Sequence, residues 1–534
     1  MGKGIVKLGE GQWAVKDGNL LAAKETNGRF KNAEFTVARG TDATYVGRDG
    51  LIKRFSSGLA NEVANGDFEL GDNGDWTLPS GWSISNNQLV GNDPSGFATV
   101  ANVFYANKSY RLDVDVAERD SGSFSIISNS TDSNSNATPA IDSAGIHTFY
   151  FHIGTISLAT LYVTFGGDFV GKINSITVRD IENFDDRPRI DFTDNTDGHL
   201  LLEPESRNLI TYSENFKDGY STTESSVDLN DAVSPDGTTT ANKFNSTATG
   251  SSIYKAHANS SALFHTVSIF LKKGTIDIVT LSVTGGSPAI SASTTVNLTS
   301  GTITASSGNG SITPTITNYG NDWYRITASS TSNGNVANPT ISIVNSSTTA
   351  SGYFYMWGLQ FEGLSYATSY IPTSGSTVTR DAETCTGAGE AADFNSEEGV
   401  LYAEIAALAD DGENNRNIRL ISSVDNTTYV VLKYGDPSNR LEYQYRTTGH
   451  SMQAQFFEDL VDVASFVKVA ATWKSNEFKL FINGEQVGVT ETSGNVSPAS
   501  TFNVLEFQGF HGKVKALRVY KETDGIDLGT LTSL

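Results

Sequence analysis

A short segment that mixes aromatic and acidic residues offers the clearest binding chemistry in this sequence. Flat aromatic rings stack on sugar rings, and carboxylate or amide oxygens accept hydrogen bonds from sugar hydroxyls. The candidate glycan-binding residues are Asp72, Asn73, Asp75, Trp76, Trp82, Phe104 and Tyr105. For the four aromatic residues a structural role in a core is the open alternative.

Two acidic turns, 72–75 and 194–198, could offer oxygen ligands to Ca²⁺. The full EF-hand pattern is missing from both, and an ordinary polar turn explains each of them. The seven histidines show no metal-ligand spacing. We therefore predict no metal site and no required cofactor, with Ca²⁺ as the open alternative.

The sequence contains no motif that would support catalysis. HExxH, GxxxxGK[ST] and CxxC are all absent. Glycosidases need two carboxyl groups that face each other across a cleft, but Asp113 and Asp115 alternate along one strand and are predicted to form its polar face. The dinucleotide-like pattern at 387–392 lacks the strand and helix around it and is interpreted as a linker. We predict that the protein is not an enzyme.

Composition and charge narrow the class of protein. The 534 residues suggest about three to five domains. The formal net charge of −23 argues against a nucleic-acid-binding surface. A single cysteine, Cys385, excludes an intrachain disulfide framework. No apolar run approaches the ~18 residues of a membrane span, and the first residues lack the apolar core of a signal peptide.

The elements that carry these residues are predicted to be short antiparallel strands. Apolar and polar residues alternate with a period of two at 110–118, 147–153, 277–285 and 323–329. Asp-Gly at 49–50 and Asn-Gly at 483–484 predict hairpin turns. Three tryptophans inside such runs are predicted to pack in cores: Trp323, Trp357 and Trp473. The predicted fold class is all-β, with tandem antiparallel β-sandwiches and a small N-terminal segment.

Eight short segments occur in an order that is found in a known group of proteins. They are ATYV (43–46), DGLIK (49–53), PRIDF (188–192), LLLEPESRNL (200–209), DWYRI (322–326), WGLQFE (357–362), ATSYIPT (367–373) and VTRDA (378–382). In these segments the chain resembles structural proteins of tailed bacteriophages, over 35–53 and 183–382. The departure lies between Lys53 and Asn183, where about 130 residues intervene. We interpret them as a domain inserted into a loop, which adds little closure entropy when its ends lie close together.

Two further resemblances concern the sandwiches themselves. The pattern at 473–484 resembles concanavalin A-like and laminin-G-like domains, and the two earlier sandwiches resemble carbohydrate-binding-module jelly rolls. The predicted divisions are an N-terminal anchoring segment (1–53), an inserted module-like sandwich (54–182), a connector (183–207), a second jelly roll (208–382), a linker (383–393), a concanavalin A-like sandwich (394–522) and a C-terminal tail (523–534).

The phage resemblance implies a virion protein that is assembled in the host cytoplasm and exposed on the particle. It implies anchoring to other virion proteins through the N-terminal segment, contact with host surface glycans and a homotrimer. The net charge and the lack of a long apolar run predict neither nucleic-acid binding nor membrane insertion. A capsid decoration or head-fibre protein with a purely structural role is the alternative. A polysaccharide-degrading tailspike is the third hypothesis.

Overall fold

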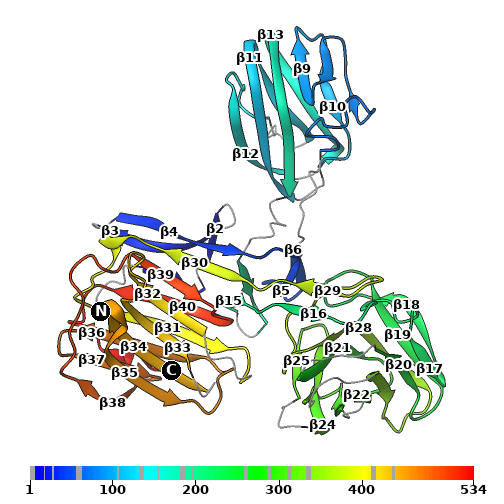
Figure 1. Ribbon diagram of the computed structural model, residues 1–534. Coiled ribbons are helices and arrows are strands. Elements are labelled where there is room, and N and C mark those ends of the chain that lie inside the picture. The colour runs from blue at the N-terminus through cyan, green and yellow to red at the C-terminus, as the bar shows by residue number, and fades with distance from the viewer. Residues whose placement is uncertain are drawn as a thin grey trace. The chain divides into compact units, whose positions relative to one another are not determined.

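The computed structural model describes residues 6–11, 13–16, 19–26, 29–55, 63–104, 108–130, 137–153, 156–180, 188–193, 196–257, 263–285, 290–309, 314–331, 338–410, 416–435 and 439–534. Nearly every element in these ranges is a strand (Figure 1). The prediction of an all-β fold is confirmed. None of the helices in these ranges is long and apolar enough to cross a bilayer.

The chain divides into two compact units. Residues 55–185 form one unit, and residues 1–54 together with 186–534 form the other. We call them the inserted unit and the main unit. The inserted unit begins and ends within a few residues of the 54–182 segment that the sequence singled out.

The inserted unit is built around two long paired strands. β11 (Lys108–Ser130) and β13 (Ile156–Asp180) pair antiparallel along most of their length, with several register shifts. The other strands of this sheet are β7 (Trp76–Thr77), β8 (Trp82–Ser85), β9 (Gln88–Asn92), β10 (Ala98–Val100) and β12 (Gly145–Ile153). Alternate residues such as Leu112, Val114 and Val116 fill one core, as the period-two pattern predicts.

The middle of the main unit is a sandwich of two six-stranded sheets. The first comprises β17 (Ser221–Thr223), β20 (Ser252–Ala256), β27 (Thr340–Asn345), β22 (Ile278–Gly285), β23 (Ile290–Asn297) and β24 (Thr302–Gly308). The second comprises β18 (Ser225–Ala232), β19 (Ala241–Ser246), β28 (Gly352–Glu362), β21 (Phe264–Lys273), β26 (Trp323–Thr331) and β25 (Ile316–Asn318). One core draws on both sheets, as in face-to-face packing.

The C-terminal part of the main unit also has two layers. One comprises β40 (Gly512–Tyr520), β31 (Glu398–Ala407), β36 (Val467–Lys474), β37 (Phe478–Ile482) and β38 (Glu485–Glu491). The other comprises β39 (Val504–Gln508), β32 (Arg416–Ile421), β33 (Tyr429–Tyr434), β34 (Arg440–Thr447) and β35 (Ser451–Asp459). The hairpin predicted at Asn483 and Gly484 joins β37 to β38, and both residues have positive φ.

Residues 1–53 do not form a structural unit of their own. β1 (Val6–Gly9) pairs with β40, the last strand of the chain, and with β3 (Asn19–Thr26). β3 continues to β4 (Arg29–Ala38), and β2 (Ala14–Lys16) flanks β3. Val6, Leu8 and Phe35 lie in the same core as the C-terminal strands. The hairpin predicted at Asp49-Gly50 is present, between β5 (Ala43–Val46) and β6 (Ile52–Phe55).

The predicted connector and linker are also part of the sheets. Within 183–207, β14 (Arg189–Asp191) pairs with β15 (His199–Leu202), which pairs with β40 beyond the end of β1. Within 383–393, β30 (Thr384–Ala388) pairs with β4 and with β39, and Figure 1 shows these three strands next to one another. β16 (Ser206–Asn208) pairs with β29 (Val378–Arg380). The sheet edges of the C-terminal sandwich are thus covered by strands from distant parts of the sequence, which bury edge groups that would otherwise stay unpaired.

Candidate functional site

The aromatic residues predicted to stack on sugars are core residues of the inserted unit. Trp76, Trp82 and Phe104 are 4%, 6% and 1% exposed. The Trp82 indole nitrogen donates to the Gly96 carbonyl at 2.8 Å, so even its polar edge is used internally. A sugar cannot reach these ring faces, and the predicted stacking platform is corrected accordingly. Tyr105 lies outside the described residues.

The acidic residues of the same prediction form an exposed turn. The Asn73 amide donates to the Asp75 carboxylate at 2.6 Å, and the Asp75 backbone N–H donates back to the Asn73 side chain at 3.2 Å. Asp72 is exposed beside them. Within the described ranges no group of three or more His, Cys, Asp or Glu residues could hold a metal ion. Asp194 and Asn195, from the second acidic turn, lie outside those ranges.

A polar pocket lies in the main unit, on the outer face of the second sheet of the middle sandwich. Along β26, Tyr324, Ile326 and Ala328 pack toward the sandwich core, so the alternate side chains project from the opposite face. Among these, Arg325, Thr327 and Ser329 line the pocket. The register sets Thr317 of β25 on one side of Arg325 and Phe270 of β21 on the other.

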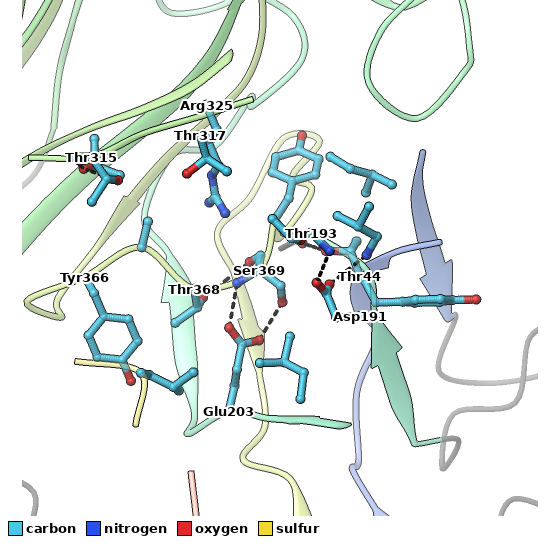
Figure 2. Close-up of a pocket in the computed structure, with 18 of the residues that line it drawn as sticks. Thr44, Asp191, Thr193, Glu203, Thr315, Thr317, Arg325, Tyr366, Thr368 and Ser369 are labelled. Carbon is cyan, nitrogen blue, oxygen red and sulfur yellow. Dashed lines mark hydrogen bonds between the residues drawn. The ribbon is translucent and has the colours of Figure 1, made fainter. Parts of the chain in front are cut away.

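The facing wall comes from segments that precede and follow the inserted unit in the sequence, and from a loop. Thr44 precedes the inserted unit, Asp191 and Glu203 follow it, and the loop contributes 365–370. The enclosed volume is about 240 Å³. In Figure 2 the Arg325 side chain extends toward the side of the pocket that Thr368, Ser369 and Glu203 form. Most residues that line the pocket therefore carry a side-chain group that can donate or accept hydrogen bonds.

Glu203 links the pocket to a buried ionic cluster. Its carboxylate accepts from the Ser369 backbone N–H at 2.8 Å and from the Ser369 hydroxyl at 2.7 Å, as Figure 2 shows. It also pairs with Arg189 at 2.7 Å and Arg380 at 2.6 Å. Burial alone would raise the pKa of Glu203, but Arg380 and Arg189 outweigh it and hold this pKa well below the ordinary value.

Glu383 is the second carboxylate of this cluster. It pairs with both nitrogens of the Arg189 fork and with Arg39 at 2.6 Å. Burial tends to raise its pKa and Arg189 lowers it, with a net lowering. The three arginines and two glutamates of the cluster are almost completely buried. The cluster joins four stretches of chain that are up to 344 residues apart.

The cluster brings together four of the eight short segments that the sequence analysis singled out. Arg189 belongs to PRIDF, Glu203 to LLLEPESRNL, Ser369 to ATSYIPT and Arg380 to VTRDA. These segments converge on one buried joint of the main unit. Sequence reasoning singled out the segments but not the joint. The buried joint could have been predicted from the Arg and Glu residues that interrupt otherwise apolar runs.

The pocket carboxylates are committed to structural contacts. Glu203 is fixed by two arginines and Ser369, as above. Asp191 accepts from the backbone N–H groups of Val46 at 2.8 Å and Thr193 at 2.9 Å. In the described part of the chain, the carboxyl group whose pKa is raised is Glu214, by burial. Glu214 does not line the pocket and accepts from the Tyr370 hydroxyl at 2.8 Å.

Arg325 is the one guanidinium that lines the pocket. Its side chain is held by a hydrogen bond of 3.0 Å to the Ser268 hydroxyl and lies over the Phe270 ring at 5.3 Å. The Tyr319 hydroxyl is in hydrogen-bonding contact with Arg325 and with Thr193. These contacts fix the guanidinium toward the pocket (Figure 2).

A family model described as the concanavalin A-like lectin/glucanases superfamily matches residues 406–523. No curated protein matches the chain. Among solved structures, the chain is similar to the CBM22-1-CBM22-2 tandem domain of Paenibacillus barcinonensis Xyn10C, with 12% identity over 57% of this chain and 96% of that one, at a TM-score of 0.28. It is also similar to domains LG4-5 of the mouse laminin alpha1 chain, with 9% identity over 60% and 93% of the two chains, at a TM-score of 0.18. These TM-scores support no argument about function. The family match gives the C-terminal sandwich its concanavalin A-like, laminin-G class, as the sequence predicted.

Proposed function

We propose that this protein is a non-enzymatic, glycan-binding component exposed on a phage-like particle, of the fibre or tail-associated kind. The observation that carries glycan binding is the lectin/glucanase family match over 406–523. The hydroxyl-rich pocket of the main unit supports it with a place of suitable size and chemistry. The particle is supported by the phage-like segments at 43–53 and 188–382.

The state of the pocket carboxylates supports the absence of catalysis. A glycosidase needs one carboxyl group protonated near neutral pH, which requires a raised pKa. Glu203 has a lowered pKa and two arginine partners, so it stays ionised and cannot donate a proton. We expect purified protein to release no reducing ends from capsule or lipopolysaccharide. Release that one carboxylate substitution abolishes would overturn this part of the proposal.

Glycan binding is tested with the full-length chain on an array of bacterial surface polysaccharides. Monovalent binding of single sugars is expected to be weak, with a dissociation constant on the order of 1 mM. Display in a homotrimer, or in many copies on a particle, is expected to raise the avidity by ~10²–10⁴. Absence of binding to every glycan, with the chain folded and multivalent, would refute the proposed function.

A purely structural role in a capsid decoration or head fibre is the second candidate. It is favoured by the ionic cluster, because four of the phage-like segments meet in a buried internal joint and not at the surface. A cryo-EM map of the particle with this chain placed separates the two candidates. A sandwich buried against other virion proteins, with its pocket closed, favours the structural role.

A further inference from the structure

The pocket contains a buried cation, Arg325, that has no ion-pair partner within the described ranges. Arg325 is 7% exposed. Its Nη2 donates to the Ser268 hydroxyl, while its Nε has no hydrogen-bond partner within the described ranges. No carboxylate of those ranges lies within ion-pair distance of it. By contrast, the buried arginines Arg189 and Arg380 each pair with a glutamate. A buried charge without an ion-pair partner is costly unless an anion joins it.

The groups around Arg325 indicate which anion fits. Thr317 lies directly across from it, Tyr319 contacts it, and the buried Ser365 hydroxyl at the pocket wall has no partner within the described ranges. A carboxylate accepts two parallel hydrogen bonds from a guanidinium fork. The neighbouring hydroxyls then remain available for further hydroxyl groups of the same ligand. The ligand therefore combines one carboxylate with several hydroxyls.

Charge and size limit the ligand further. Asp191, Glu203 and Lys513 also line the pocket, so together with Arg325 the formal charges of these four residues cancel, and a singly charged carboxylate suits the pocket better than a doubly charged phosphate. The volume of about 240 Å³ lies below the range of roughly 300–1,000 Å³ that is typical of drug-sized ligands. One sugar ring suits this space better than a longer stretch of polysaccharide.

We propose that this pocket binds the carboxylate-bearing sugar unit of an acidic glycan, such as a uronate, with Arg325 as the residue that recognises the carboxylate. The inference rests on the proposed function, since it names the class of glycan and places its site. It moves the expected binding site from the inserted unit to the main unit. The uronate can be a free monosaccharide or a terminal unit of a polymer, and the shared chemistry is the carboxylate on a hydroxylated ring.

The test measures binding of D-glucuronate, D-glucose, acetate and inorganic phosphate to the full-length protein by calorimetry or saturation-transfer NMR. D-glucuronate is expected to bind at least ten times more tightly than D-glucose, acetate or phosphate. The same chain is then applied to the polysaccharide array, where acidic glycans are expected to exceed neutral ones. The array arm detects a terminal uronate that binds only as part of a polymer.

Two substitutions test the role of Arg325. Arg325→Met is expected to weaken binding of D-glucuronate or acidic polymers at least tenfold and to leave the thermal unfolding temperature unchanged or higher, because it removes an unpaired buried charge. Arg325→Lys keeps the charge but loses the fork, and an intermediate affinity is expected. The matched control is Arg207→Met, at an exposed arginine that bonds Thr377 outside the pocket. It is expected to bind like the unsubstituted protein.

The outcomes separate this inference from the proposed function. Array binding that survives in both Arg325 variants overturns the inference and leaves glycan binding intact. Equal affinity for glucose and glucuronate does the same. Equal affinity for acetate or phosphate and glucuronate makes the pocket a simple anion site and also overturns it. No binding to any sugar or polysaccharide refutes the proposed function itself.

Discussion

At the scale of single residues, the buried ionic cluster dominates the chemistry of the main unit. Arg189 bridges Glu203 and Glu383 and is fully buried. Its pKa is raised because the two carboxylates outweigh the effect of burial. Removing one member of such a network leaves the others buried without compensation. The cluster is therefore expected to stabilise the joint only when all of its arginines and glutamates are present.

Arg189→Met tests this expectation. The free energy of unfolding of the main unit should fall by about 3–5 kcal/mol, because two buried carboxylates lose a shared cation. Urea unfolding of the full chain, followed by circular dichroism, measures the change. Arg54→Met is the control, since Arg54 forms an exposed pair with Asp42 and should cost at most about 1 kcal/mol. Equal effects of the two substitutions would contradict the role given to the cluster.

The cluster also sets an expected dependence of stability on pH. The pKa of Glu203 is lower in the folded chain than its ordinary value of 4.5. Its contribution to stability is therefore fully present above pH 4.5 and is lost progressively as the pH falls below that value. Scanning calorimetry between pH 7 and pH 3 should show the main-unit transition moving to lower temperature in the acid range. In Glu203→Gln this acid sensitivity should be smaller.

Trp82 provides a residue-scale test in the inserted unit. Its ring packs against Phe169 at 5.8 Å and is almost fully buried. Trp82→Ala should destabilise this unit by about 3–5 kcal/mol. It should leave glycan binding by the intact chain unchanged. Phe97→Ala, at a ring that is 49% exposed, is the control and should unfold almost like the original protein.

At the scale of elements, the strands could be predicted but their partners could not. The period-two alternation at 110–118 and 323–329 identified β11 and β26 correctly, because one face of each strand is buried. β30 was interpreted as a linker because its residues, Thr384–Ala388, are small and polar. β30 is a strand because it pairs with β4 and β39. The residues of 384–388 alone do not indicate these partners, which are far away in the sequence.

The candidate site was missed for a related reason. Thr317 and Arg325 look like the solvent-facing half of an alternating pattern. Their pocket exists only because a second layer of chain, with Thr44 and Ser369, covers that face. Conversely, Trp76 and Trp82 lie between turn residues and look exposed, whereas tertiary packing buries them. Whether such a side chain is buried depends on contacts with distant segments, which the sequence of one strand does not show.

Removal of 6–38 tests whether the first four strands are structural. Val6, Leu8, Leu20 and Phe35 are buried in the core of the C-terminal sandwich. Their loss exposes that core and an edge of β40, so the truncated chain should aggregate or become sensitive to protease across 398–520. Limited proteolysis with mass spectrometry measures this. A truncated chain that keeps a protected C-terminal sandwich would restore the interpretation of 1–53 as a separate anchor.

At the scale of the whole molecule, the inserted unit should be dispensable for the fold of the main unit. The chain leaves the main unit after Arg54 and returns at Asp186. Joining these two residues directly should leave the main-unit unfolding temperature within a few degrees of the original, since loop length contributes little to closure entropy. Calorimetry of the deletion variant and of the full chain makes the comparison. Collapse of the 208–381 sandwich in the deletion variant would refute the insertion.

The pairing of β1 with β40 has a consequence for how the protein is made. The ribosome releases Val6–Gly9 about 500 residues before its partner at Gly512–Tyr520. At roughly 5–20 residues per second, β1 waits about 25–100 s for that partner. Meanwhile the inserted unit and the middle sandwich emerge with their own strand partners and can fold first. During translation the nascent chain therefore carries β1–β4 at its leading end without the core that buries Val6, Leu8 and Phe35, and chaperone binding is expected to concentrate there until β40 has been made.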